Sequence, residues 1–347
     1  MNYFNMQYTS GAAALGAIAA TAIYYYLHPK NENLIRTWKA VGNVTKLHLH
    51  PLKSGRRLEL TSADCTDVGI RQNPEDQEGL QLRDRTYLVY GEKNNEFKTA
   101  RTFPQLLLVQ MSVHDKDQIR LDAPGMPTLL FKVPTKLKNK ELRVKVHQSE
   151  EIYSIDCGDE AANWISNYIH GDSTPGLRIG YHDGSMKHRR NILKIYKSFS
   201  IYKNLTNKSA GLYSDLSAVL LVNQASVDDL NDKLREENRV VSENFRSSIT
   251  IAGEGAPAYA EDDWEWLKIG EAVFRNVKPC TRCIMTTINP DTGVRNPERE
   301  PLKTMETYRR LKNQKPNKER EIITTMGISM EVNVPGVIRI NDTVYIA

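Results

Sequence analysis

Cysteine is scarce in this chain, which has only four in 347 residues, at positions 65, 157, 280 and 283. Two of them stand alone, and the other two form a Cys-x-x-Cys pair. Small secreted domains that depend on disulfide bonds carry cysteine at a much higher density. The composition therefore excludes a disulfide framework and indicates a reducing compartment.

Several signatures of nucleotide and nucleic-acid binding are also missing. The sequence has neither the glycine motif of a dinucleotide-binding fold nor a Walker motif, and no basic run is interleaved with aromatic residues. The net charge of +5, from 47 basic and 42 acidic residues, does not require nucleic acid. A mixed solvated surface explains it, and so would an anionic cofactor, an acidic protein partner or an anionic membrane.

The sequence contains one long apolar run, which ends at residue 27, and none after it. Gly11 to Leu27 is uncharged and mostly apolar, and its length is near the lower limit of the roughly 17–25 residues that span a bilayer. Basic residues follow this run and none precedes it, so the positive-inside rule places the rest of the chain in the cytosol. We predict a transmembrane anchor in residues 1–40, in the mitochondrial outer membrane or alternatively the endoplasmic reticulum. A cleaved or buried segment is the competing interpretation.

The chain is longer than the roughly 250–300 residues at which a single hydrophobic core stops growing, so we expect one large or two modest domains. After residue 40, the sequence shows many short strand patterns and few helical ones. This predicts an α+β fold that is mainly β, in two barrel-like domains at residues 41–182 and 183–347.

The expected strands span residues 44–50, 86–90, 106–113, 141–147, 218–222, 249–251, 267–277, 284–288, 326–334 and 337–346. Helices are expected at 159–169 and at 226–236, where Ser226 would cap the helix. The last two strands would form a hairpin about Pro335-Gly336. Residues 297–318 would form an exposed insertion with a short helical piece.

The sharpest local feature is Cys280-Thr-Arg-Cys283. A Cys-x-x-Cys pair can be half of a zinc site, a redox dithiol, or the source of one thiolate ligand for a soft metal cofactor. The other cysteines are isolated and no histidine follows His188, which weakens the zinc interpretation, and no thioredoxin-like helix pattern surrounds the pair. We expect Arg282 to favour the thiolate form of Cys283. On spacing alone, the three interpretations stay open.

A second set of residues is basic and scattered along the chain. Its short motifs are Pro51-Leu-Lys-Ser54, Leu82-Arg-Asp-Arg85, Thr99-Ala-Arg101 and Asn244-Phe-Arg246. Taken singly, each basic residue is best explained as a surface salt-bridge partner. Together they offer the arginine forks, lysine charge and hydroxyl groups that an anionic, phosphate-bearing ligand needs.

These motifs occur in the order of a known family. The chain also contains Asp156-Cys-Gly-Asp-Glu-Ala-Ala-Asn-Trp-Ile165, Tyr213-Ser-Asp-Leu-Ser217, and Cys280-Thr-Arg-Cys-Ile-Met-Thr-Thr287 followed by Asp291-Thr-Gly293. From about Val44 to its C-terminus, the sequence resembles the mitochondrial amidoxime-reducing component family. That family joins an N-terminal β-barrel domain to a molybdenum-cofactor-sulfurase C-terminal (MOSC) domain. The predicted anchor also lies where the family has one.

The resemblance implies a cofactor and the residues that bind it. Cys283 matches the ligand of the molybdenum in a molybdopterin cofactor, and Cys280 matches a partner that does not bind the metal. The other residues that match cofactor contacts are Lys53, Ser54, Arg85, Ser217, Arg246, Thr281 and Arg282. Asp215 lies in a matching loop, and we predict that it is a catalytic carboxylate near the metal and the candidate general acid.

The activity that the resemblance implies is the two-electron reduction of N-hydroxylated compounds, such as amidoximes, hydroxylamines and N-oxygenated bases. The chain has no flavin or haem motif, so electrons would come from outside, from NADH through cytochrome b5 reductase and cytochrome b5. Cytochrome b5 is acidic, so a basic surface such as Lys187 to Arg190 would attract it. The same run also suits a solvated linker.

The sequence departs from the family pattern in two places. Leu216 stands where a small hydroxyl residue is common, and Ser247 and Ser248 stand where the family often has Pro-Asn. Two other functions are compatible with parts of the pattern. A sulfur-transfer protein is one, because MOSC domains also occur beside cysteine desulfurases, but no pyridoxal-phosphate domain is present. A membrane-anchored scaffold without the cofactor is the other, and the retained Cys283 and basic residues argue against it.

Overall fold

The computed structural model of the chain describes residues 36–171, 174, 176–196, 202–311 and 322–347. The apolar run from Gly11 to Leu27, and with it the predicted membrane span, lies outside these ranges. Among the helices that the described ranges contain, none combines the length and the apolar character needed to cross a membrane. Residues 38–347 group into one structural unit, to which the following description refers.

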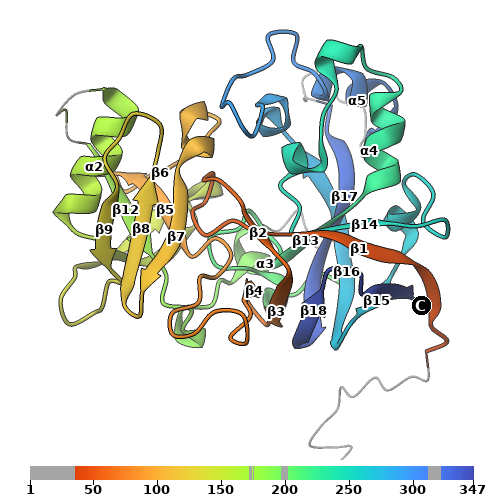
Figure 1. Cartoon of the computed structure of the whole chain (residues 1–347), viewed down its shortest axis with the longest axis horizontal. Coiled ribbons are helices and arrows are strands. Elements are labelled where there is room, and N and C mark those ends of the chain that lie inside the picture. The colour runs from red at the N-terminus through yellow and green to blue at the C-terminus, as the bar shows by residue number, and fades with distance from the viewer. Residues whose placement is uncertain (1–35, 172–173, 175, 197–201, 312–321) are drawn as a thin grey trace, which may run out of the picture. The chain divides into compact units, whose positions relative to one another are not determined.

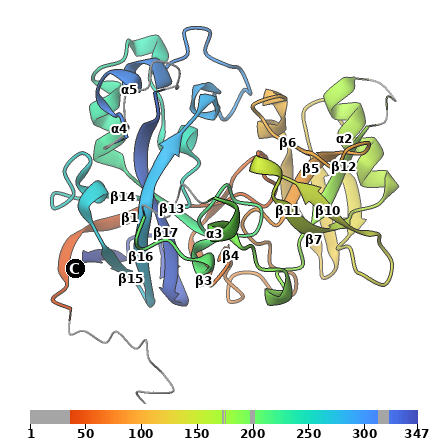
Figure 2. The same cartoon turned by 180° about the vertical axis from the view of Figure 1, so that it is seen from behind.

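A closed barrel of seven strands dominates the C-terminal half (Figures 1 and 2). Its strands are, in order around the barrel, β14 (Ile249–Ala252), β13 (Val219–Asn223), β17 (Thr324–Val334), β16 (Ala272–Arg282), β15 (Trp266–Ile269), β19 (Thr343–Ile346) and β1 (Lys39–Leu49). The pairing of β1 with β14 closes the ring, and β2 (Leu58–Leu60) pairs with β1 outside it. A closed ring leaves no unpaired strand edge within it.

The closure between β1 and β14 depends on two glycines that face one another. A Cβ atom on Gly42 would lie 2.3 Å from the carbonyl oxygen of Ala252, and a Cβ atom on Gly253 would lie 2.3 Å from the Cα of Gly42. Both distances are far inside van der Waals contact, so neither position can hold a side chain without movement of the backbone. The glycines therefore let the two strands approach closely enough to pair.

A smaller sheet lies beside the barrel in both views (Figures 1 and 2). Its strands are, in order, β10 (Glu141–Lys145), β11 (Glu151–Asp156), β12 (Leu177–Tyr181), β5 (Tyr87–Gly91) and β6 (Phe97–Lys98). A single bridge between Glu96 and Lys145 joins its two ends and curls the sheet on itself. The antiparallel strands β7 (Gln110–Asp115), β8 (Gln118–Asp122) and β9 (Leu129–Lys132) form a separate sheet.

Helices are few in the described ranges, as predicted for a mainly β fold. Those of α type there are α2 (Asp159–His170), α3 (Ile192–Ile195), α4 (Gln224–Asn231) and α5 (Leu302–Tyr308). The longest of them, α2, has two acidic residues in its first turn and ends at Gly171, which adopts a left-handed backbone that suits a helix C-terminus. Its buried face, which includes Trp164 and Ile165, packs into the core.

Strands from the first part of the chain take part in the C-terminal half. β1 belongs to the seven-stranded barrel, and β3 (Ser62–Thr66) pairs with both β18 (Gly336–Arg339) and β4 (Gly69–Gln72). The sheets therefore extend across the predicted boundary between residues 182 and 183. Because Lys53 and Ser54 follow β1 closely, this arrangement carries them to the barrel.

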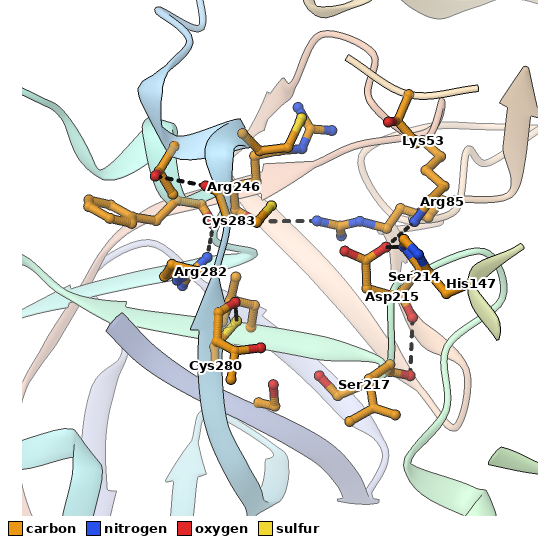
Figure 3. A pocket seen from close by; sticks show the side chains of 18 of the residues that line it. Lys53, Arg85, His147, Ser214, Asp215, Ser217, Arg246, Cys280, Arg282 and Cys283 are labelled. Atoms are coloured by element: carbon orange, nitrogen blue, oxygen red, sulfur yellow. Dashed lines mark hydrogen bonds and ion pairs between the residues drawn. The ribbon is translucent and has the colours of Figure 1, made fainter. Parts of the chain in front are cut away.

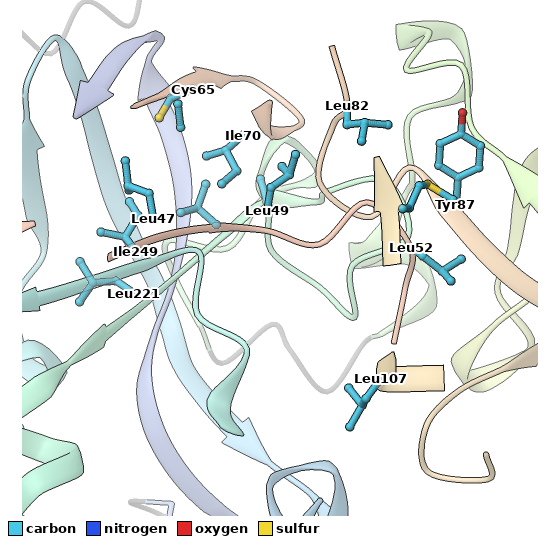
Figure 4. Close-up of a cluster of buried hydrophobic side chains, with 14 of the residues drawn as sticks. Leu47, Leu49, Leu52, Cys65, Ile70, Leu82, Tyr87, Leu107, Leu221 and Ile249 are labelled. Atoms are coloured by element: carbon cyan, nitrogen blue, oxygen red, sulfur yellow. The ribbon is translucent and has the colours of Figure 1, made fainter. Parts of the chain in front are cut away.

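One continuous hydrophobic core runs through both halves. Leu47 of β1 packs with Leu221 and Ile249 at the barrel, and Leu82 and Tyr87 extend the same cluster towards the smaller sheet (Figure 4). All five side chains are at most 2% exposed. The two halves therefore share a core, which fixes the groups that lie between them.

Most predicted elements are present, but several were wrong. Residues 284–288 form a 3-10 helix, η9 (Ile284–Thr287), in place of the predicted strand, and the strand predicted at 106–113 begins as the 3-10 helix η1 (Pro104–Leu108). The strand predicted at 267–277 is the hairpin of β15 and β16. The hairpin predicted about Pro335-Gly336 does not form, because β17 pairs with β13 and β16.

The predicted cap of the helix after β13 is also wrong. Asn223 is the N-cap of α4, since its side chain accepts a hydrogen bond from the N–H of Ala225 at 3.2 Å. Ser226 lies inside the helix, and its hydroxyl donates to the buried carboxyl group of Glu261 at 2.8 Å. The sequence does not distinguish a serine that caps a helix from one whose hydroxyl bonds a buried group, because tertiary packing determines which bond forms.

Three histidines are buried, at most 2% exposed, and unusual in their ionisation. Burial lowers the pKa of His48 and the pKa of His182 to about 4, and it lowers the pKa of His50 well below its ordinary value. All three are therefore neutral in the folded protein near pH 7. In the unfolded chain they would titrate near the ordinary value of about 6.5.

We predict that replacing a core leucine will cost far more stability than replacing an exposed one. Leu221 is fully buried between β14 and β17, whereas Leu137 is 97% exposed. Leu221→Ala should lower the free energy of unfolding by about 2–5 kcal/mol, because it removes buried methyl groups and leaves a cavity. Leu137→Ala should change it by less than about 0.5 kcal/mol. Urea denaturation of both variants measures this, and equal losses would contradict the assigned core.

We also predict that stability will fall as the pH drops below about 6.5. The folded pKa of each buried histidine lies below its unfolded pKa, so the unfolded chain binds more protons between these two values, and acid favours unfolding. Each histidine contributes up to about 1.4 kcal/mol per pH unit in this window. His182→Gln should reduce the slope of unfolding free energy against pH, while His114→Gln, at an exposed position, should leave it unchanged. The same slope in all three proteins would refute the assignment.

Candidate functional site

A cavity of about 440 Å³ is lined by residues of both halves. The residues that the sequence assigned to the site all line it: Lys53, Ser54, Arg85, Asp215, Ser217, Arg246, Thr281, Arg282 and Cys283. Figure 3 shows Lys53, His147 and Asp215 together on one side of the cavity, with Cys283 and Arg246 across from them. The fold thus brings together groups that are far apart along the chain.

Three of these residues have a left-handed backbone, which residues other than glycine rarely adopt. The angle φ is 66° at Ser54, 47° at Arg85 and 53° at Arg246. Such a conformation costs of the order of 1–3 kcal/mol and persists only where the surrounding structure holds it. Here the backbone N–H of Arg85 donates to His50 at 2.7 Å, and that of Arg246 donates to Glu243 at 3.0 Å. Tight turns therefore present these side chains to the cavity.

Positive charge gathers in the cavity wall, which contains Lys53, Arg85, Arg246, Lys278 and Arg282. Burial and, to a lesser extent, the nearby charge of Arg85 lower the pKa of Arg246 to about 9. Burial also lowers the pKa values of Lys53, Lys278 and Arg282. Cations that are held close together away from water favour an anionic occupant beside them.

One of these cations has an unsatisfied donor. Nη1 of Arg246 donates to the carbonyl of Gly55 at 2.9 Å, but its Nη2 is buried and has no hydrogen-bond partner among the described residues. Leaving a buried donor unpaired costs about 1–3 kcal/mol. Arg85 extends Nη2 towards the carbonyl of Arg246, at 3.3 Å. This donor set fits a phosphate or another oxygen anion.

Cys283 lies where β16 ends and η9 begins, and its side chain is exposed to the cavity. Cys280 lies three residues earlier, with its Sγ 3.8 Å from the carbonyl oxygen of Thr281. In the part of the chain that the structure describes, no three His, Cys, Asp or Glu side chains gather as a site of protein ligands alone would require. The zinc interpretation of the cysteine pair therefore finds no further ligands there.

Arg282 favours the thiolate of Cys283 as predicted, but its effect on the thiol pKa is small. Arg282 donates from Nη1 to the carbonyl of Phe245 and from Nε to that of Met326, both at 2.8 Å, so its hydrogen bonds go to backbone groups. The Cys283 thiol opens to the cavity but is surrounded by protein, and this burial raises its pKa, as does the charge of Asp215. Arg282 opposes the shift only weakly. Metal binding would itself remove the thiol proton.

Asp215 forms an ion pair with Lys53 at the cavity surface. Its side chain is 70% accessible from the cavity, yet protein surrounds it closely. That burial alone would raise the pKa of Asp215, but the charge of Lys53 and a hydrogen bond from His147 hold it well below its usual range. Asp215 is therefore ionised near neutral pH. A carboxylate in this state accepts protons, so its predicted role as the general acid is not supported.

Arg190 holds the loop that carries Asp215. Its guanidinium donates to both carboxylate oxygens of Glu150, at 2.8 and 2.7 Å, and to the carbonyl of Ser214 at 2.6 Å. Arg190 is only 6% exposed, so the predicted basic surface from Lys187 to Arg190 is wrong for this residue. Its charge stabilises the interior beside the cavity, where it is fully paired.

Further polar residues line the cavity that the sequence did not assign individually to the site, among them Thr99, Arg101, His147 and Lys278. Thr99 and Arg101 belong to one of the basic motifs, and Lys278 precedes the cysteine pair by two residues. His147 follows the strand β10. His147 also ends the strand predicted at residues 141–147, and a polar residue at the end of a strand is a signal that could have found it.

The residues that depart from the family pattern differ in their position relative to the cavity. Ser247 and Ser248 are buried outside the cavity lining, where the hydroxyl of Ser247 bonds that of Thr250 at 2.9 Å and the N–H of Ser248 donates to Leu220 at 2.8 Å. Leu216 does line the cavity. The two serines therefore form hydrogen bonds within the barrel. Of the three departures from the family pattern, only Leu216 changes the cavity wall.

Two domain families match the chain in the expected order. The MOSC N-terminal beta barrel domain matches residues 41–172, and the MOSC domain matches residues 209–345. Mitochondrial amidoxime-reducing component 1 of Mus musculus is 34% identical over 97% of this chain and 91% of its own length.

Other relatives agree. Mitochondrial amidoxime-reducing component 1 of Homo sapiens is 34% identical over 96% of this chain and 90% of its own length. Mitochondrial amidoxime reducing component 2 of Bos taurus is 34% identical over 89% and 84%, respectively. Both domains and nearly the whole length are shared, so the chain belongs to the family of mitochondrial amidoxime-reducing components.

Proposed function

We propose that the chain is a molybdenum-cofactor oxidoreductase that reduces N-hydroxylated substrates such as amidoximes, hydroxylamines and N-oxygenated bases. The observation that carries the proposal is a cavity in which an accessible thiol, Cys283, shares the wall with buried cations, one of which has an unpaired donor. Reduction of an N–OH group breaks the N–O bond, consumes two electrons and two protons, and releases water. The names of the relatives point to the same chemistry.

The cavity residues fit a molybdopterin cofactor by their chemistry. Cys283 would be the metal ligand, because a soft thiolate suits such a metal. The residues that would hold the pterin and its phosphate are Lys53, Ser54, Arg85, Ser217, Arg246, Thr281 and Arg282. Once bound, the cofactor would supply the two-electron redox chemistry.

The protein would bind and orient the reactants. The cations of the wall would neutralise the cofactor phosphate, and the Nη2 of Arg246 would gain the partner it lacks. Asp215 would act as a catalytic carboxylate that accepts a hydrogen bond from a substrate N–H group, since it faces the cavity and is ionised. Arg190 would keep the Asp215 loop in place.

Electrons would reach the site from NADH through cytochrome b5 reductase and cytochrome b5. An external donor is required because N–O reduction consumes two electrons per turnover. We also propose an N-terminal anchor in the mitochondrial outer membrane with the site facing the cytosol. The mitochondrial part of this proposal draws on the names of the relatives, and the anchor on the apolar run and the basic residues after it.

The rival functions fit the cavity less well. A scaffold without cofactor has no need for strained turns at Ser54, Arg85 and Arg246 or for a buried donor without a partner. A sulfur-transfer protein would use the accessible thiol of Cys283 but would not require several cations around it. The charge of the wall therefore favours a bound anionic cofactor.

We predict that Cys283→Ala will abolish both bound molybdenum and amidoxime reduction. The variant removes the metal ligand while leaving the basic wall intact. Molybdenum content and benzamidoxime reduction should be measured on the full chain supplied with NADH, cytochrome b5 and its reductase. Cys280→Ala, on the same strand end, should keep the metal. A parent protein without molybdenum, or a Cys283→Ala variant with full metal and turnover, would refute the proposal.

We predict opposite effects of Arg246→Gln on stability and on cofactor binding. The buried guanidinium is partly unpaired and repelled by Arg85, so its removal should leave the cofactor-free chain equally stable or more stable. Cofactor affinity should fall roughly 10-fold to 100-fold, as expected for a lost hydrogen bond to a charged group of about 1.5–3 kcal/mol. Urea denaturation without cofactor and molybdenum retention on dilution measure the two effects. Arg339→Gln, at a position far from the cavity lining, is the matched control, and unchanged retention in Arg246→Gln would contradict the assigned contact.

A further inference from the structure

His147 occupies an unusual electrostatic position in the cavity. Its Nε2 lies 3.0 Å from Nη2 of Arg101 and 3.4 Å from Oδ1 of Asp215. A guanidinium and a carboxylate therefore both lie within reach of the same ring nitrogen. Lys53 forms an ion pair with the same Asp215 oxygen, so the carboxylate stays ionised whichever way the histidine bonds.

One nitrogen cannot satisfy both neighbours at once. Without a proton, Nε2 accepts a hydrogen bond from Arg101, and with a proton it donates one to Asp215. Gain or loss of a proton therefore exchanges one good hydrogen bond for another. A ring with a charged partner in each state can take up and release a proton without leaving a buried group unpaired.

The turn around His147 holds the ring in place. Gln148 and Ser149 both have a left-handed backbone, with φ of 53° and 59°, which costs energy unless the surroundings enforce it. The hydroxyl of Tyr196 donates to the carbonyl of His147 at 3.1 Å, and the ring of Phe97 packs edge-on against the imidazole, with centroids 4.7 Å apart. The side chain of His147 keeps 29% of its surface open to the cavity.

We propose that His147 is the proton donor of the reaction, an inference that rests on the proposed function. The proton on Nε2 passes to the hydroxyl oxygen of the substrate as the N–O bond breaks, so that this oxygen leaves as water. The second proton comes from solvent and goes to the nitrogen. The external donor supplies the two electrons. Nε2, now neutral, accepts from Arg101 until it is reprotonated through the open side of the cavity. Besides its proposed contact with the substrate, Asp215 stabilises the protonated ring.

The test compares His147→Gln with the parent holoenzyme. Glutamine can still bond Arg101 and Asp215 but cannot titrate. We expect kcat to fall about 100-fold or more with KM and molybdenum content little changed, as for loss of a general acid. In the parent, kcat should decline at alkaline pH as the donor loses its proton, and this decline should be absent in the variant. In His147→Ala, added imidazole should restore part of the lost kcat, and His114→Gln should behave as the parent.

A second measurement does not depend on turnover. ¹⁵N NMR of the histidine-labelled full chain, without cofactor, reports the protonated fraction of Nε2 in His147. Arg101→Gln should raise that fraction at neutral pH and Asp215→Asn should lower it. A His147→Gln variant that keeps its metal and its kcat within about 3-fold of the parent would overturn the inference. A parent that lacks metal and activity would instead overturn the proposed function, whatever the NMR result.

Discussion

The pairing of β1 with β14 is the constraint on which the rest of the structure depends. It inserts an N-terminal strand into a barrel whose other members come from the C-terminal half, and it closes that barrel. The two strands approach so closely at Gly42 and Gly253 that no side chain fits there. Because Lys53 and Ser54 follow β1, this pairing delivers them to the same cavity as Arg246 and Cys283. Without it, the site would lack one of its walls.

Electrostatics then determine what the cavity can hold. Its cations are close together and mostly shielded from water, with Asp215 the one acidic side chain in the described lining. This arrangement is unfavourable for the protein alone, as the low pKa of Arg246 and its unpaired donor show. An anionic occupant would relieve this repulsion, so the same charges that weaken the unliganded protein would favour its binding. The left-handed turns that present these side chains are a further cost of the same kind.

The secondary structure could be predicted where local pattern and final environment agree. The alternation of residues 44–50 and the helical spacing of residues 159–169 correspond to β1 and α2. The apolar residues of both patterns are buried, but in β1 the alternating His48 is buried as well, as is His50 after it. The predicted secondary structure was wrong where the strand β16 ends at the site. Ile284–Thr287 is rich in residues that favour strands but forms a 3-10 helix directly after Cys283. Ser226 looked like a cap, but its hydroxyl bonds a buried glutamate.

The sequence by itself determined the mainly β character, the family pattern and the identity of nine of the residues that line the cavity, because these depend on composition and on short motifs in order. Only the tertiary structure decided what those residues face. It buried Arg190 against Glu150, turned Arg282 to backbone carbonyls, and placed His147 between Arg101 and Asp215. The physical reason is that ionisation and hydrogen bonding depend on neighbours that lie 37 to 68 residues apart in the sequence, and no local pattern contains that information.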